Sequence, residues 1–400
     1  MKSETKIAFF LAWKFLQRGN KWTLLLIIFL MAIAFINLVF ITSLFDGIVK
    51  GTNDQVINTH SGHILMVPSE GEEIIANQGK ALKQIESTPG VVAASAQNFI
   101  PASLKYQNIS GNWQVLAIDP SREKQVLNVS EHMIAGEYLS DTDMDQIIIG
   151  RQIAGGQGVE NDAFSFKDAK VGDKVQLTFA GGSHDLTIKG IFYTKFIDTD
   201  QRAFITTKTL DQLMPDLENT ATSISIRIDR TGNEEVVINR LEDKHLSGRF
   251  FSWQEVSGLM DTVAESFIFI NALLTTVGIL IAAVTIFIVI YIDISSRRQQ
   301  IGVLRAIGIK SYLIRSAYVI QTAVYSVFGV LLGAGILFAV LVPYFNAHPF
   351  ELPIGDSVLS VRSWDFIFRA ELIIWVAIGS GLIPATMITR VKILNAIFNR

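Results

Sequence analysis

The chain contains no cysteine among its 400 residues, which excludes a disulfide framework, a thiolate metal site and a cysteine nucleophile. Charged residues are scarce as well, at 18% against the roughly 25% of soluble proteins. The 34 basic and 37 acidic residues nearly balance, which excludes a polybasic nucleic-acid-binding protein, so we expect no nucleic acid partner. With a mean hydropathy of +0.37, this shortage of charge indicates that part of the chain lies in lipid.

The chain also lacks the Gly-x-x-x-x-Gly-Lys-Ser/Thr motif of phosphate-binding loops, so we do not expect it to bind ATP in that way. His60 and His63 form the one close histidine pair, but the glycine between them and the strand-like run after them favour a turn over a metal site. Asp141, Asp143 and Asp145 alternate as in a calcium loop but lack its glycine and its final glutamate. We therefore expect no catalytic residue, metal or cofactor in this chain.

Long stretches without Asp, Glu, Lys or Arg predict membrane-spanning helices, since a helix needs about 20 mostly apolar residues to cross a bilayer. The four stretches are Trp22–Phe45, Ser266–Ile292, Ser316–Phe350 and Leu372–Thr389. The third is long enough to hold a crossing over 316–344 and the start of an outer segment over 345–371. Buried core helices are the alternative, but they are usually shorter and interrupted by charge.

The interior of these stretches contains mild polar residues and no ionisable group near its centre. Proton- and ion-coupled transporters usually keep an ionisable group at mid-depth, so this class is disfavoured and an external energy source is expected. Small residues in the last two stretches predict close helix packing. They are Gly329, Gly333, Gly335, Gly379 and Gly381.

The charges that flank the four stretches predict one orientation. Segments 1–21 and 293–315 each hold five basic residues and one acid, and the tail 390–400 holds three basic residues and no acid. Segment 46–265 holds 19 basic and 31 acidic residues. Because basic flanks stay in the cytoplasm, both termini and the 293–315 loop are predicted inside and the long 46–265 segment outside. We therefore expect a multi-pass protein of the cell inner (cytoplasmic) membrane.

The outer segment resembles a folded domain, because β-rich runs separated by turns alternate with two helical patterns. The predicted strands are His63–Val67, Val91–Ala96, Trp113–Ile118, Gln146–Ile149, Lys174–Phe179, Leu186–Phe192, Arg202–Thr206 and Ser223–Ile228. The predicted helices are Gln78–Ser87 and Asn233–Lys244. The order of elements suggests a module inserted at about 125–215. The fold class is thus a membrane protein of four transmembrane α-helices with a large extracytoplasmic α+β domain between the first and the second.

Two short segments have an amphipathic pattern at the inner face. Residues 1–21 are predicted to form an elbow helix in the headgroup layer, and Gly19-Asn20 is predicted to be the bend into the first crossing. In the 293–315 loop, basic residues precede apolar residues at helical spacing, and Gly308 ends the pattern. A helix on the membrane surface and a docking helix for another protein explain this second segment equally well.

The loop sequence Ser295-Ser-Arg-Arg-Gln-Gln-Ile-Gly-Val-Leu-Arg-Ala-Ile-Gly-Ile-Lys310 closely resembles the coupling-helix motif of the MacB/LolC/FtsX superfamily of ABC-transporter permeases. That family has one crossing, a large external domain and three more crossings, as predicted here. Gly381-Leu-Ile-Pro-Ala385 and Leu394-Asn-Ala-Ile397 also fit, and Gly190-Ile-Phe-Tyr-Thr194 is most similar to the lipoprotein-releasing LolC/LolE branch. The resemblance covers nearly the whole chain.

This resemblance implies that the chain pairs with a second permease subunit, identical or related, and with a cytoplasmic ABC ATPase dimer that binds ATP and Mg in its place. Work would be done outside the membrane without passage through a pore. The residues implied to couple to the ATPase are Arg297, Arg298, Ile301, Leu304, Arg305 and Ile307.

A permease of this kind that extracts lipoproteins or other amphiphiles from the outer leaflet needs an apolar contact surface at that depth. The candidate residues at the outer ends of the first two crossings are Phe40, Leu44, Phe45, Val263, Phe267 and Ile270, although contact with membrane lipids explains their apolar character equally well. A MacB-like efflux permease working with an adaptor, and an FtsX-like mechanotransmitter that controls an external hydrolase, are the alternatives.

Two departures from the family pattern matter. Gln300 stands where the family often has glutamate. LolC-type proteins use a protruding hairpin to recruit a periplasmic chaperone, whereas Ala180–His184 predicts only a tight turn. Such a hook is therefore not expected, and the 154–169 loop is left as a solvated loop or as the contact for another extracytoplasmic partner.

Overall fold

The computed structural model describes residues 2–18, 21–156, 159, 162–256, 258–352 and 355–390, and it divides into two compact units. The helical unit consists of Met1–Ile48, Glu265–Phe350 and Ser357–Arg400. The sheet domain consists of Val49–Ala264 with Glu351–Asp356. The predicted tail motif Leu394–Ile397 and the predicted bend Gly19-Asn20 lie outside the described residues.

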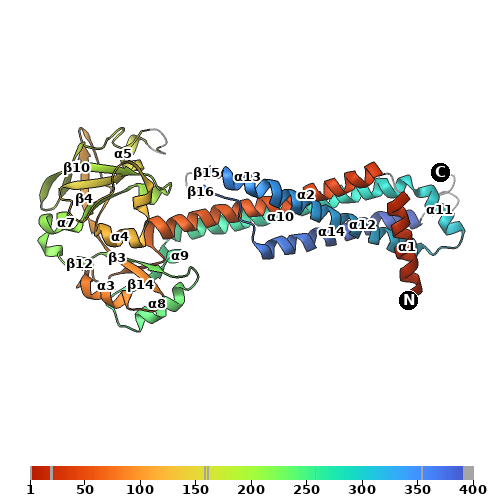
Figure 1. Cartoon of the computed structure of the whole chain (residues 1–400), viewed down its shortest axis with the longest axis horizontal. Helices are drawn as coiled ribbons and strands as arrows, with labels where there is room; N and C mark the ends of the chain where they lie inside the picture. The colour runs from red at the N-terminus through yellow and green to blue at the C-terminus, as the bar shows by residue number, and fades with distance from the viewer. Residues whose placement is uncertain are drawn as a thin grey trace. The chain divides into compact units, whose positions relative to one another are not determined.

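The helical unit is built from long apolar helices (Figure 1). Its elements are α1 (Lys2–Arg18), α2 (Lys21–Gln55), α10 (Gly258–Ser296), α11 (Arg298–Ala306), α12 (Ser311–Ile336), the π-helical η5 (Leu337–Leu341), α13 (Val342–Ala347) and α14 (Ser363–Arg390). In the described residues, four helical stretches are long and apolar enough to cross a membrane: Lys21–Ser61, Phe269–Ser296, Ser311–Ala347 and Ser363–Arg390. The four predicted apolar stretches are therefore helices.

Some helix ends differ from the ends of the charge-free stretches. The first stretch ends at Phe45, whereas α2 continues to Gln55, and the last begins at Leu372, whereas α14 begins at Ser363. Charge limits how far a helix can lie in lipid, but it does not stop the helix itself. Pro384 lies inside α14, where it removes one backbone hydrogen bond from the ladder.

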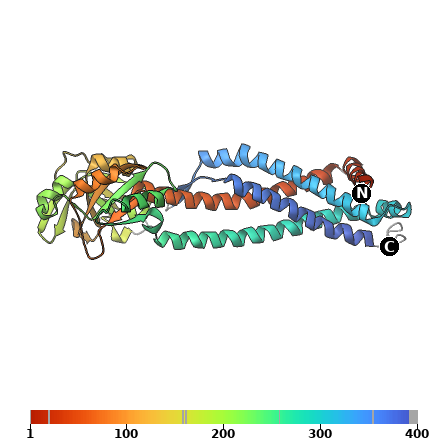
Figure 2. The same ribbon diagram turned by 90° about the horizontal axis from the view of Figure 1, so that it is seen from below.

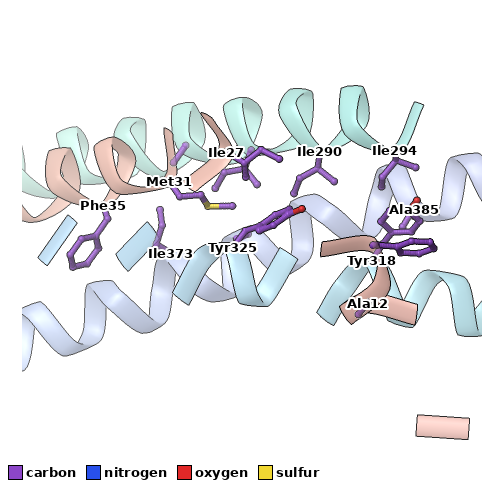
Figure 3. Close-up of a cluster of buried hydrophobic side chains, with 14 of the residues drawn as sticks. Ala12, Ile27, Met31, Phe35, Ile290, Ile294, Tyr318, Tyr325, Ile373 and Ala385 are labelled. Atoms are coloured by element: carbon purple, nitrogen blue, oxygen red, sulfur yellow. The ribbon is translucent and has the colours of Figure 1, made fainter. Parts of the chain in front are cut away.

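One apolar core joins the helices of this unit. Figure 3 shows inward side chains from α2, α10, α12 and α14, including Phe35, Ile290, Tyr325 and Ile373. α1 lies across the bundle at the end where α11 is found, and both views agree on this (Figures 1 and 2). Its Ala12 packs into the same core, while Phe9, Phe10 and Trp13 are exposed.

Three of the five predicted packing glycines lie where helices come close. A Cβ atom on Gly329 would lie 2.4 Å from the Cβ of Met31, and one on Gly333 would lie 2.9 Å from Cδ1 of Phe35. A Cβ on Gly381 would lie 2.7 Å from Oγ1 of Thr322. At Gly335 and Gly379 a Cβ would meet nothing within 4 Å. Close packing is thus confirmed for Gly329 and Gly333 against α2 and for Gly381 against α12.

The sheet domain contains, in its described part, one large mixed sheet with the strand order β14-β1-β13-β3-β6-β11-β8-β10-β9-β4-β5, with β7 paired to β10. The strands of this sheet are β1 (Ile64–Val67), β3 (Val91–Ile100), β4 (Ala102–Tyr106), β5 (Ile109–Gly111), β6 (Gln114–Ile118), β7 (Met133–Gly136), β8 (Gln146–Gly150), β9 (Lys174–Phe179), β10 (Gly182–Phe192), β11 (Arg202–Thr206), β13 (Ser223–Ile228) and β14 (Arg249–Ser252). Two further two-stranded sheets are described. In one, β2 (Ile75–Ala76) pairs with β12 (Thr220–Ala221), and in the other, β15 (Phe350–Leu352) pairs with β16 (Gly355–Ser357).

Helices cover both faces of this sheet. They are the π-helical η1 (Val56–Ser61), α3 (Gln78–Glu86), α4 (Pro120–Val126), α5 (Arg151–Ala154), α6 (Ile197–Asp200), α7 (Thr207–Leu213), α8 (Glu234–Glu242), α9 (Trp253–Val256) and the 3₁₀ turns η2 (Val129–His132), η3 (Asp162–Phe164) and η4 (Pro215–Leu217). The run Ile147-Ile-Ile149 is fully buried, because β8 is covered on both faces and pairs in parallel with β10.

The eight predicted strands and both predicted helices of this domain are confirmed within a few residues. The sequence pattern missed six strands, which are short or carry polar residues: β2, β4, β5, β7, β12 and β14. The inserted module at about 125–215 stays a prediction. Strands β4 and β5 precede that range, and β4 pairs with β9 inside it. The connection near residue 180 is even tighter than predicted, because Phe179 already pairs with Gly182 and leaves only Ala180-Gly181 in the turn.

Candidate functional site: the basic helix α11 and its buried anchor

The segment between α10 and α12 forms a separate short helix. Arg297 precedes the first turn of α11 with non-helical angles (φ −103°, ψ 12°). Gly308 adopts a φ of +101°, the left-handed conformation that favours glycine and commonly follows a helix end. Lys310, in extended conformation, then begins α12. The sequence therefore breaks the chain twice within about 15 residues and isolates α11 as a rigid element.

Arg297 anchors α11 to the helical unit. Its Nη2 atom donates to Oδ1 of Asp293 at 3.0 Å, and its Nη1 atom donates to the backbone carbonyl of Phe15 at 2.9 Å. The two side chains are only 11% and 6% exposed, so this ion pair is largely shielded from water. Because breaking a buried pair leaves an uncompensated charge, the position of Arg297 is strongly fixed.

Further polar contacts extend this anchor to α12. Nε2 of Gln321 donates to Oδ2 of Asp293 at 3.3 Å and also contacts the hydroxyl of Tyr325. The rings of Phe15 and Tyr318 stack with centroids 5.1 Å apart, and the guanidinium of Arg297 lies 6.0 Å from the centroid of the Phe15 ring. Asp293 and Arg297 thereby hold α1, α10, α11 and α12 together at one place.

The structure places the three apolar residues among the six predicted coupling residues on different sides of the segment. Ile301 is 1% exposed, and Leu304 packs against the core of the helical unit together with it. Ile307 is 75% exposed, and Val303, which the prediction did not include, is 44% exposed. Arg298 and Arg305 are half-buried. Ile301 and Leu304 therefore join α11 to the core of the helical unit, whereas Val303 and Ile307 are exposed.

The described members of the six predicted lipid-contact residues differ in their burial and in their neighbours. Phe40 packs against Phe345 of α13 with ring centroids 5.5 Å apart, and Leu44 packs into the helical core. Phe45 is half-buried, while Ile270 is 42% exposed. The side chains of Val263 and Phe267 lie outside the described residues. One polar contact, between Oγ1 of Thr42 and Oδ1 of Asn271 at 3.2 Å, joins α2 to α10 at this level.

The three alternating aspartates of the sheet domain have different partners. Asp143 binds Nζ of Lys189 at 2.5 Å, and Asp145 binds Nε2 of His184 at 2.6 Å. Asp141 accepts from the backbone N–H of Ser121 at 3.0 Å. Burial acts to raise the pKa of Asp143, but the hydrogen bonds from Lys189 and Ser140 outweigh it and lower that pKa. Within the described residues, no group of three or more His, Cys, Asp or Glu is arranged to hold a metal ion.

The anchor itself was not found from the sequence. In the sequence, Asp293 is the first charge of the 293–315 loop, and Gln321 is a polar residue within the third charge-free stretch. The available signal was the spacing of Asp293 and Arg297, since residues four apart on a helix face each other. Their contact with Phe15 and Gln321 depends on packing between distant segments, which no local pattern encodes.

Two family models match the chain. The MacB-like periplasmic core domain matches residues 24–244, and the FtsX-like permease C-terminal region matches residues 272–393. No curated protein matches the chain in sequence.

Three solved structures are similar to the sheet domain. The periplasmic region of MacB from Actinobacillus actinomycetemcomitans is 12% identical, and the match covers 52% of this chain and 96% of that chain at a TM-score of 0.38. The extracellular domain of the noncanonic ABC-type transporter YknZ from Gram-positive bacteria is also 12% identical, with 47% and 98% covered at a TM-score of 0.34. A permease domain from Porphyromonas gingivalis is 15% identical, with 47% and 88% covered at a TM-score of 0.29.

Proposed function

Because the chain belongs to the ABC-transporter permeases that combine a MacB-like periplasmic core domain with an FtsX-like permease region, we propose that it works as a membrane permease subunit driven by a separate cytoplasmic ATPase. The ATPase dimer would bind ATP and Mg, and a second permease subunit would complete the transporter. The chain would convert ATP hydrolysis in its partner into movement of the sheet domain outside the membrane.

The buried anchor of α11 is the observation that carries this proposal. A force on α11 has to act on α1, α10 and α12 together, because Arg297 bonds to Phe15 and Asp293, and Asp293 bonds to Gln321. A helix that merely rests on a membrane surface gains nothing from a buried ion pair to three neighbours. The exposed side chains of Val303 and Ile307 supply an apolar contact for the ATPase on the opposite face.

We propose extraction of lipoproteins or other amphiphiles from the outer leaflet as the work performed. The apolar helices of the bundle, with no ionisable group near the middle of the four predicted crossings, support a substrate that is itself lipid-anchored. The family matches do not distinguish the LolC/LolE branch from the rest of the MacB/FtsX superfamily, and the resemblance of Gly190–Thr194 to that branch is what favours the same substrate class. The β9–β10 hairpin has only the two-residue turn Ala180-Gly181, and we propose that it does not recruit a chaperone.

A MacB-like efflux permease that works with an adaptor is the second candidate. The match of residues 24–244 to the MacB-like core domain favours it. Purification of the tagged chain from its own membranes distinguishes the two functions, because lipoproteins would copurify in the first case and an adaptor in the second.

Two variants test the role of α11 in the complex with the copurifying ATPase. Ile307→Asp places a charge on the exposed face and is expected to prevent ATPase association. Arg297→Lys keeps the charge opposite Asp293 but cannot also reach the carbonyl of Phe15, so the ATPase should bind and hydrolyse ATP while substrate release falls about tenfold, the equivalent of one charge-assisted hydrogen bond. Val236→Asp, an exposed apolar residue on α8, is the matched control.

The proposal fails if Ile307→Asp retains the ATPase as well as the control does. It also fails if the isolated chain hydrolyses ATP without a partner. Full substrate release by Arg297→Lys would show that the anchor does not transmit movement.

A further inference from the structure

The sheet domain contains a pocket of about 300 Å³ that the proposed function does not use. It is lined by residues of β1, β13, β3, β6 and β11, together with His60 and Ser61 of η1 and Val256 of α9. Small-molecule sites in proteins begin at about this volume. Its wall is apolar at Leu65 and Phe99, and Phe99 is 42% exposed.

A nearly buried arginine lines this pocket. Arg202 is 9% exposed, and its guanidinium makes three hydrogen bonds. Nε donates to Oε1 of Gln114 at 3.2 Å, Nη1 donates to the carbonyl of His60 at 2.9 Å, and Nη2 lies 2.9 Å from Nε2 of His60. A guanidinium has five N–H donors, so two of them have no acceptor among the described residues.

His60 does not compensate the charge of Arg202. Its Nδ1 lies 3.2 Å from Oγ1 of Thr199, and that hydroxyl donates to the carbonyl of Thr59 at 3.3 Å. The hydroxyl therefore accepts from Nδ1–H, which leaves Nε2 as the acceptor for Arg202. This chain of bonds holds the imidazole in its neutral form with the proton on Nδ1.

No carboxylate in the described part of the chain forms an ion pair with Arg202. Glu123 faces the same side of the sheet, but its Oε1 accepts from Gln97 at 2.7 Å, and burial raises its pKa and so favours its neutral form. Exposed Asp198 and buried Glu123 both favour the charged form of Arg202 electrostatically, but neither carboxylate forms an ion pair with it in the described part of the chain. Burial lowers the pKa of Arg202 to about 10, which leaves it charged at neutral pH. A buried charge without a close counterion is costly, so this position is poised to receive an anion.

We propose that this pocket binds a small anion, a carboxylate or a phosphate group, through the two spare donors of Arg202. The apolar part of the same ligand would contact Phe99 and Leu65, and Thr222 and Ser223 also line the pocket. Planar guanidinium donors match the oxygen spacing of both anions. The inference does not depend on the transport role, because it rests only on residues within the sheet domain.

The test uses the full chain in a neutral detergent and calorimetric titration with hexyl phosphate, hexanoate, inorganic phosphate and hexanol. Hexyl phosphate and hexanoate should bind, and hexanol should not. The informative variant is Gln114→Glu, which places a carboxylate beside Nε of Arg202 and supplies the missing counterion from within. It should fold, melt at a higher temperature and bind hexyl phosphate at least tenfold more weakly. Gln125→Glu, exposed on α4, is the matched control.

Arg202→Met should also lose hexyl phosphate binding. If Arg202→Met does not fold, Gln114→Glu still decides the test. Equal affinity for inorganic phosphate and hexyl phosphate would support the anion site and assign it to a free anion, whereas tighter binding of hexyl phosphate would assign it to an amphiphile. Binding of hexanol as tight as that of hexyl phosphate, or unchanged binding in Gln114→Glu, would overturn the proposal.

Discussion

At the scale of single residues, burial decides how the charged groups of this chain behave. Arg297 and Asp293 compensate each other within hydrogen-bond distance, whereas Arg202 has hydrogen bonds but no close carboxylate among the described residues. Asp200 is a third case: Oδ1 accepts from the backbone N–H of Thr194 at 2.8 Å and from its hydroxyl at 2.9 Å. Burial outweighs these bonds and raises the pKa of Asp200 to about 7.

This pKa predicts that Asp200 makes the sheet domain less stable as the pH rises. Between about pH 4 and 7 the folded chain holds a proton that the unfolded chain has lost, so the free energy of unfolding falls across this window and is level above it. The shift of about 3 pH units corresponds to roughly 4 kcal/mol. Asp200→Asn keeps an oxygen acceptor for Thr194 and should remove most of this dependence.

Calorimetric unfolding of the full chain at pH 5, 6.5 and 8 measures this effect. Asp200→Asn should gain stability over the native chain at pH 8, and less than half as much at pH 5. Asp185→Asn, an exposed aspartate on β10, should follow the native chain throughout. A gain by Asp200→Asn that is the same at all three pH values would contradict the prediction.

At the scale of elements, the sequence pattern predicted a helix or a strand correctly where a single local property determines it. Length and missing charge identified the four long helices, and β-rich runs such as Arg202–Thr206 and Ser223–Ile228 became strands with the predicted ends. Strands β4 and β5 were missed because they are stabilised by pairing with β9 and with each other and not by their own composition. The burial of Ile301 was not predicted either, because contacts with distant segments of the chain determine which face of α11 is buried.

The glycines of α12 give a test of helix packing at this scale. Gly333→Ala would place a methyl group 2.9 Å from Cδ1 of Phe35 and 3.0 Å from the carbonyl of Ala32, so we expect a loss of about 1–3 kcal/mol. Gly335→Ala meets no neighbour within 4 Å, and because alanine favours a helix over glycine it should be neutral or stabilise by about 0.5–1 kcal/mol. Thermal unfolding in detergent compares the pair, and equal effects of the two substitutions would refute the close contact.

At the scale of the whole molecule, the missing cysteines become an experimental advantage. Because the native chain has no thiol, a single introduced cysteine reports only its own position. Val92 on β3 is 60% exposed and Ile307 after α11 is 75% exposed, so both can be labelled without disturbing a core. The charge distribution predicts that Val92 faces the exterior and Ile307 the cytoplasm.

Labelling of intact cells with a membrane-impermeant maleimide measures this orientation. Val92→Cys should react directly, whereas Ile307→Cys should react only after the membrane is permeabilised, and the native chain should not react at all. The reverse pattern would remove α11 from the reach of a cytoplasmic ATPase and with it the proposed source of energy.

In the sheet domain, β1 pairs with β14, and these two strands lie close in the chain to the long helices α2 and α10. In the sequence, η1 follows α2 directly and precedes β1, while β14 leads through α9 into α10. The two connections therefore reach adjacent antiparallel strands, with Ile64 opposite Ser252 and Val67 opposite Arg249. If one connection slides along the other, the hydrogen bonds between these strands are sheared together and are not opened one by one. Within the sheet domain, the β1–β14 pair would thus resist sliding of one strand along the other more strongly than it resists separation from one end.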